Sequence, residues 1–406
     1  MSIENPENGH KAEAQAERRS ERRREAQQFA NQGSFERALE SFAGEPGLLE
    51  EMVQGLQARE SGIMHEAPYL SEHDWQVLTV LELFDSATFE HCKRTFYLAK
   101  EKLERGGQVG HTLGHLLSGE SLSVSDVLRA CLLHDCGKMC LDKTILNDTH
   151  TDEEWLESSR RYFEETENGR RIAASIGDID TYLAAHPGLR PVHVVPFEAS
   201  FDPSSPEDMA HLAIIQEKGI DTSRTLAEII APHQDRSGEI IRLGNPDDPA
   251  ADLVENHHPR TEEDGGMRPV GKEEFPVGVS LLRASVESSE GIARVYDILR
   301  IVDIYDAYNS DRSYKPGHPM LSTFAYILHE TDRGLIDARF ADAWIRDSLS
   351  DITERYMDSF VAALEEKKKT SDEKRSRLID RILTEERAAE KFLRERGMFS
   401  ADSAHA

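Results

Sequence analysis

The chain has 406 residues, of which 38% are hydrophobic and 31% charged, a composition typical of globular proteins large enough to bury a sizeable core. Its formal charge is −28, from 48 Lys and Arg against 76 Asp and Glu. This acidity argues against general nucleic-acid binding and against anionic membranes, because both require clustered Lys and Arg. A small phosphorylated ligand is compatible with it where basic groups or metal ions gather locally.

The cellular compartment follows from what the sequence lacks. It has no run of about 18 apolar residues, so we expect no membrane span. Its N-terminal segment, MSIENPENGHKAEAQAERRSERRREAQ, lacks the apolar core of a signal peptide. The four cysteines are Cys92, Cys131, Cys136 and Cys140. We predict a cytoplasmic protein with free thiols, because disulfides are rare in that compartment.

Changes in composition divide the chain into three regions. Residues 1–70 form a charged N-terminal region that we expect to be partly disordered and partly helical. Residues 71–365 carry most of the apolar residues, with an insertion at about 150–220. Residues 366–406 predict a charged C-terminal helix and tail.

Helical patterns dominate the first part of the main region. Apolar residues recur at helical spacing between residues 74 and 103, and Asp85 can cap a second helix over 87–103. The segment VSDVLRACLLHDCGKM predicts a further helix, with Ser123 or Ser125 as its N-cap.

The insertion differs in character. Its segment HPGLRPVHVVPFEASFDPSSPED is rich in proline, and we predict irregular structure with one short strand at PVHVV. Helical patterns resume at RTLAEIIAPH and PAADLVENHH and continue from ARVYDILRIVDIYDAY onwards. We therefore predict an all-α bundle with an irregular insertion and a small helical N-terminal region.

Two segments place ionisable side chains at the ends of apolar helices. In ACLLHDCGKM, His134 and Asp135 are a natural pair of metal ligands, and a carboxylate can bridge two ions. Lys138 follows after a glycine and can meet a phosphate oxygen as a point charge. In VENHHPR, the adjacent His257 and His258 can both reach one metal only near a helix end.

Two further segments carry candidates. Asp303 lies in the apolar run of LRIVDIYDAYNSDRSY, where a carboxylate needs a partner, and Asp306 follows one turn later, in a position that we interpret as structural. His91 lies in TFEHCKRTFYLA, on the helix before the His-Asp pair.

The order of these residues resembles the HD superfamily of metal-dependent phosphohydrolases. LRACLLHDCGKMCLDKTILN is similar to the signature segment of the HD-GYP subfamily, known for cyclic di-GMP phosphodiesterases. HQDRSGEII, ADLVENHHPR and RIVDIYDAYNSDRSY resemble later segments of that subfamily in the same order. The resemblance covers roughly residues 74–150 and 222–347.

The resemblance implies an HD-domain helical bundle with a metal centre. Two divalent metal ions are expected, iron or manganese first, with zinc as an alternative. One ion would be held by His91, His134, Asp135 and Asp303. The second would be held by His233, His257 and His258, with Asp135 bridging the two ions.

The resemblance also implies a reaction, the hydrolysis of a phosphodiester in a cyclic dinucleotide such as cyclic di-GMP. Asp135 and Lys138 would be catalytic, with Lys138 binding the scissile phosphate. Arg312 and Lys315 would bind the second phosphate of a dinucleotide. His186, in LAAHPGLR, is the rival of His233, and the following EII favours His233.

Several features depart from the subfamily and keep alternatives open. The chain reads HHPRTEEDGGMRP where the subfamily usually reads HHExxDGxGYP, so Pro259 replaces a glutamate. Ala87 stands where some members carry the glutamate of a third metal site. The alternatives are a phosphohydrolase for another nucleotide or a phosphomonoester, and an inactive signalling module that binds a nucleotide or a partner protein. A homodimer or a signalling protein partner is compatible with either.

Overall fold

The computed structural model describes most of the chain. The described residues are 35, 47–104, 107–117, 122–146, 152–185, 191–258, 295–309, 320–332, 336–349, 356–369 and 373–399. These residues form helices joined by turns, with no β-strand among them and one isolated antiparallel bridge between Pro196 and Thr225. The all-α prediction is confirmed. Within the same residues, no helix combines the length and the apolar character needed to cross a membrane.

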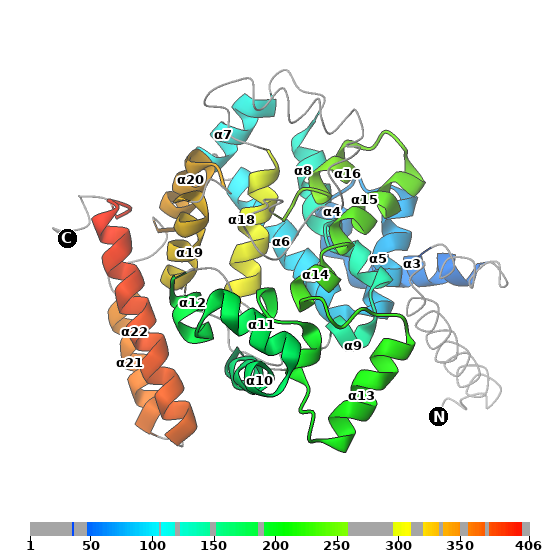
Figure 1. Ribbon diagram of the computed structural model, residues 1–406. Helices are drawn as coiled ribbons and strands as arrows, with labels where there is room; N and C mark the ends of the chain where they lie inside the picture. The colour runs from blue at the N-terminus through cyan, green and yellow to red at the C-terminus, as the bar shows by residue number, and fades with distance from the viewer. Residues whose placement is uncertain are drawn as a thin grey trace, which may run out of the picture.

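Helices from both halves of the chain form the main bundle, and several of them pack against α18 (Figure 1). The first half supplies α3 (Leu48–Arg59), α4 (Ser61–Glu66), α5 (Glu72–Phe84), α6 (Ser86–Glu104), α7 (Gln108–Leu117), α8 (Val124–Leu133), the 3-10 helix η1 (Cys136–Cys140) and α9 (Lys143–Leu146). The second half supplies α14 (Leu226–Ile230), α15 (His233–Gly244), α16 (Pro249–Val254), α18 (Tyr296–Asn309), α19 (Met320–Asp332) and α20 (Ala338–Leu349).

Local sequence signals set the helix starts in the first half. Asp85 accepts hydrogen bonds from the Ala87 amide (3.0 Å) and the Thr88 hydroxyl (2.6 Å), as expected of an N-cap. Ser123 caps α8 in a reciprocal capping box with Asp126, which decides between the two predicted serines. These caps satisfy amides that would otherwise lack partners at the first turns.

The main core lies between these helices. On α18, Ile298, Leu299, Ile301 and Val302 are at most 1% exposed. They belong to the same apolar cluster as the buried faces of α5, α6, α8, α19 and α20. A helix buried nearly all round is held rigidly, and α18 carries Asp303.

A buried ion-pair network joins three of these helices. Arg129 on α8 pairs with Asp74 on α5 (2.6 Å) and with Asp248 (2.5 Å), the N-cap of α16. Both carboxylates are at most 3% exposed, and the guanidinium supplies the positive charge that each contacts. The network fixes α8 relative to α16, the two helices whose C-terminal ends carry predicted ligands.

The insertion corrects part of the prediction. Its described residues are mainly helical, and the predicted strand is absent from them because Pro191–His193 forms a 3-10 helix. The elements are α10 (Asp152–Glu165), α11 (Glu167–Ile176), α12 (Ile179–Ala185), η2 (Pro191–His193), η3 (Phe197–Ser200) and α13 (Pro206–Glu217). The prolines were misleading because Pro206 stands in the first turn of α13, where proline favours a helix start.

The insertion has an apolar cluster of its own. Trp155, Phe163, Phe197 and Ile215 pack together in it, and Ile145 of α9 joins them. The inserted helices therefore form a small unit with an apolar core that it shares with α9 and α14 (Figure 1).

A helical hairpin ends the described chain. It consists of α21 (Tyr356–Lys369) and α22 (Glu373–Glu395), and α22 packs along α19. The predicted charged C-terminal helix corresponds to α22. The predicted boundary at residue 365 falls inside α21.

Candidate metal centre

Seven predicted ligands meet in the interior of the main bundle. His91 lies on α6 and Asp303 on α18, both inside helices, whereas the other five lie at helix ends. His134 is the C-cap of α8 and Asp135 follows it. His233 is the first residue of α15, and His257 and His258 follow the end of α16. The two adjacent histidines thus lie just beyond the end of α16, a position that allows both to face one centre.

One group of donor atoms, which we call site A, surrounds His91 Nε2. This nitrogen lies 3.0 Å from Asp303 Oδ1, 3.2 Å from His134 Nε2 and 3.5 Å from Asp135 Oδ2. His134 Nε2 lies 3.5 Å from the same Asp135 oxygen. Site A thus contains two imidazole nitrogens and two carboxylate oxygens.

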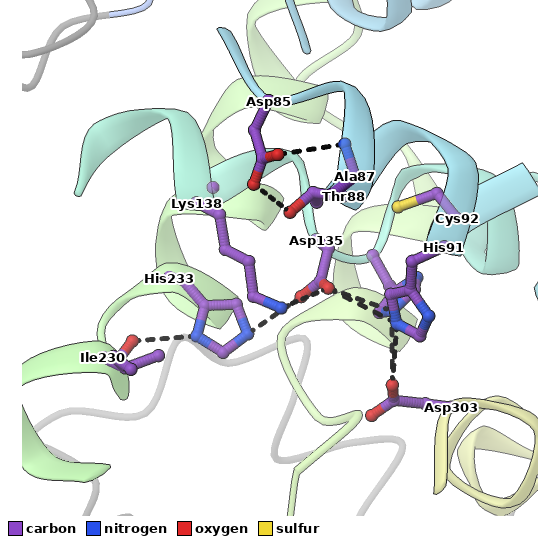
Figure 2. Close-up of polar contacts among 12 residues, drawn as sticks. Asp85, Ala87, Thr88, His91, Cys92, Asp135, Lys138, Ile230, His233 and Asp303 are labelled. Atoms are coloured by element: carbon purple, nitrogen blue, oxygen red, sulfur yellow. Dashed lines mark hydrogen bonds and ion pairs between the residues drawn. The ribbon is translucent and has the colours of Figure 1, made fainter. Parts of the chain in front are cut away.

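A second group, site B, faces the other oxygen of Asp135. His233 Nε2 lies 3.2 Å from Asp135 Oδ1 and 3.3 Å from His257 Nε2. The ring of His258 lies 5.1 Å from that of His233, and a ligand atom of each of the three histidines falls within one cluster of 4.8 Å. Figure 2 shows Asp135 between His233 on one side and His91 on the other.

Hydrogen bonds behind the histidines fix which nitrogen faces the centre. The Nδ1–H groups of His134, His233 and His257 each donate to the carbonyl three residues earlier, at 2.9, 2.8 and 2.5 Å. His91 differs, because its Nδ1–H donates to the Asp306 carboxylate (2.6 Å). All four rings therefore present Nε2 to the centre, as histidine ligands of metals commonly do.

The donor set fits divalent metal ions. The Nε2 atoms of His233 and His257 approach to 3.3 Å although their Nδ1–H groups are already used, so two lone pairs face each other. Among the described residues, the buried Asp135 Oδ1 has no hydrogen-bond partner. A cation between these atoms would satisfy all three. Imidazole with carboxylate suits iron, manganese or zinc.

The protonation states of site B favour metal binding. Burial, followed by repulsion from the neighbouring His258, lowers the pKa of His257 well below its usual value. Burial and His233 likewise lower the pKa of His258 to about 3. Both rings are neutral at pH 7, and a metal ion needs no proton to leave them.

The carboxylates of the centre are ionised. Burial alone would raise the pKa of Asp135, but the charges of Lys138 and His134 lower it well below its usual value. Burial opposes ionisation of Asp303 as well, and hydrogen bonds from His134 and His91 lower its pKa. The two anions favour cations at this place.

Close packing of η1 on α15 holds the two halves of the centre together. The Gly137 amide donates to the Ser237 hydroxyl (2.8 Å), and a Cβ at Gly137 would lie 1.9 Å from the carbonyl oxygen of His233. Only glycine allows this approach, which brings Asp135 and His233 within reach of each other. Lys138, also on η1, pairs with Asp135 through its ammonium group.

Some expected residues lie beyond what can be placed. Arg312, Lys315 and His186 fall outside the described residues.

Asp306, interpreted from the sequence as structural, accepts a hydrogen bond from His91 and two more from Arg94. The sequence analysis missed Arg94. The available signal was its spacing, three residues after His91, which places both on one helix face.

Comparisons with known proteins identify no family. No family model, no curated protein and no solved structure matches the chain.

Proposed function

We propose that the chain is a metal-dependent phosphohydrolase, with a cyclic dinucleotide such as cyclic di-GMP as its first candidate substrate. The main observation behind the proposal is that the two oxygens of one carboxylate face two different groups of donor atoms. Asp135 Oδ2 faces the nitrogens of site A, and Asp135 Oδ1 faces those of site B. A carboxylate shared in this way is typical of paired-metal hydrolytic centres.

The bound metals would supply Lewis-acid stabilisation of phosphoryl oxygens and would activate a water molecule as the nucleophile. Site A would hold one ion through His91, His134 and Asp303. Site B would hold the other through His233, His257 and His258. Asp135 would serve both ions.

Lys138 is the chain's own group for the substrate phosphate. Its side chain is 21% exposed, so it reaches the surface from the edge of the centre. Its ammonium now pairs with Asp135. Once cations neutralise Asp135, the ammonium is available to a phosphate oxygen as a point charge.

A different phosphohydrolase activity is the second candidate. In sequence the inserted helical unit lies between α9, which follows η1 and Lys138, and α14, which precedes His233. A unit in this position can limit the size of a substrate, which favours a mononucleotide or a phosphomonoester.

The four described cysteines are free thiols, which supports a cytoplasmic location.

Turnover by the metal-loaded protein tests the proposal. The protein would be loaded with manganese, or with iron without oxygen, and given cyclic di-GMP, mononucleotides and an aryl phosphomonoester. Asp135→Ala serves as the inactive control, and Asp332→Asn, in a surface ion pair, as the matched control. We expect hydrolysis by the wild type and by Asp332→Asn alone. Activity confined to phosphomonoesters would favour the second candidate, and metal binding without any turnover would reject hydrolysis.

A further inference from the structure

Among the described residues, a histidine of site A has an anionic hydrogen-bond partner of a kind that His233 and His257 of site B lack. Behind His134, His233 and His257 the acceptor is a backbone carbonyl, whereas behind His91 it is the carboxylate of Asp306. Asp306 is 4% exposed. A buried carboxylate at this position both orients the ring and makes its Nε2 a stronger donor.

Arg94 holds that carboxylate in place. Its Nε donates to Asp306 Oδ1 (2.7 Å) and one terminal nitrogen donates to Oδ2 (2.9 Å), so the pair is bidentate. Asp306 Oδ2 also accepts the Nδ1–H of His91 at 2.6 Å. The guanidinium side chain is 45% exposed, so the chain of contacts runs from the surface to the metal ligand.

We propose that Arg94 and Asp306 are positioning residues that tune metal binding at site A alone, through His91. The inference rests on the proposed metal centre but not on hydrolysis. Asp306 sets the tautomer and the basicity of His91, and Arg94 fixes the plane of the carboxylate. The hydrogen bonds behind the His233 and His257 rings of site B end on backbone carbonyls, whereas the carboxylate of Asp306 lies behind His91 of site A.

Two substitutions separate orientation from charge. Asp306→Asn keeps an oxygen that accepts the Nδ1–H of His91 but removes the charge, whereas Asp306→Ala removes both. Loss of such a partner costs about 10- to 100-fold in metal affinity. We expect about 10-fold weaker binding at site A for Asp306→Asn and about 100-fold for Asp306→Ala, with site B unchanged.

The measurement is a titration of the metal-free protein with Co²⁺ against a competing chelator, followed by visible absorption. His258→Ala, which weakens site B, assigns each binding step to its site. Asp332→Asn is the matched control, because Asp332 also forms a bidentate pair with an arginine, Arg396, in an exposed position that contacts none of the candidate ligands. Thermal unfolding of each metal-free variant confirms that it is folded.

A double-mutant cycle tests the part assigned to Arg94. We expect Arg94→Met to weaken site A on its own and to add little in the Asp306→Asn protein, since both act through one contact. Additive losses would remove Arg94 from the relay. Unchanged Co²⁺ binding in Asp306→Ala, or equal losses at both sites, would overturn the proposal as a whole. Because no substrate is present, these results are independent of turnover, so an inactive protein with an intact relay is recognised as such.

Discussion

The contact between η1 and α15 predicts an effect of replacing Gly137 by alanine. The added Cβ would lie 1.9 Å from the His233 carbonyl oxygen and 2.5 Å from the Ser237 amide nitrogen. Both are backbone atoms, so no change of rotamer relieves the overlap. Ordinary contact begins at 3.4 Å, so η1 and α15 must move apart by about 1.5 Å.

That movement separates Asp135 from His233, whose ligand atoms now lie 3.2 Å apart. We expect Gly137→Ala to lose the ion of site B and to keep that of site A, whose helices do not include α15. Overpacking of this kind typically costs about 1–3 kcal/mol in the free energy of unfolding.

The assay combines metal content after equilibrium dialysis with urea unfolding of the metal-free protein. The control is Gly114→Ala on α7, where a Cβ meets nothing within 4 Å. An alanine inside a helix should stabilise the control by about 0.5–1 kcal/mol. A Gly137→Ala protein with two tightly bound ions and unchanged stability would refute the reasoning.

Three further predictions concern the whole fold. Arg129→Met leaves two buried carboxylates without their cationic partner and should cost about 3–5 kcal/mol in urea unfolding. Arg160→Met, in an exposed pair, should cost at most about 1 kcal/mol, and equal costs would contradict the network. A thiol reagent should label Cys140 alone in the native protein, because the other described thiols are buried and burial raises the pKa of Cys131 and Cys136. Rapid labelling of more than one thiol would argue against the packing. Removing the metal should lower the melting temperature, since an ion present at about 100 times its Kd stabilises the folded protein by about 2.7 kcal/mol. If reloading the metal left the melting temperature unchanged, metal binding would not be linked to folding.

Local signals predicted the helices of the main bundle. The caps at Asp85 and Ser123 depend on neighbours within three residues, so they are visible in the sequence. The prediction for the insertion was wrong because it interpreted prolines that lie at helix starts and in turns as signs of irregular structure. Their stability comes from the cluster around Trp155 and Phe197, a set of contacts that no short window of sequence contains.

The sequence named seven candidate ligands that lie together in the structure, but it did not indicate the residues that support them. Ionisable residues at the ends of apolar helices need partners, and that argument selected His134 and Asp135. The role of Asp306 depends on His91, 215 residues away in sequence. The need for glycine at position 137 depends on α15, about 100 residues further on. Both follow from packing between helices rather than from any local pattern.

The central claim is that two ions share Asp135. Anomalous diffraction from crystals grown with manganese would test it most directly. We predict two peaks, one within bonding distance of His91, His134 and Asp303 and the other beside His233, His257 and His258, each next to a different oxygen of Asp135. A single peak, or two peaks that do not share this carboxylate, would contradict the account.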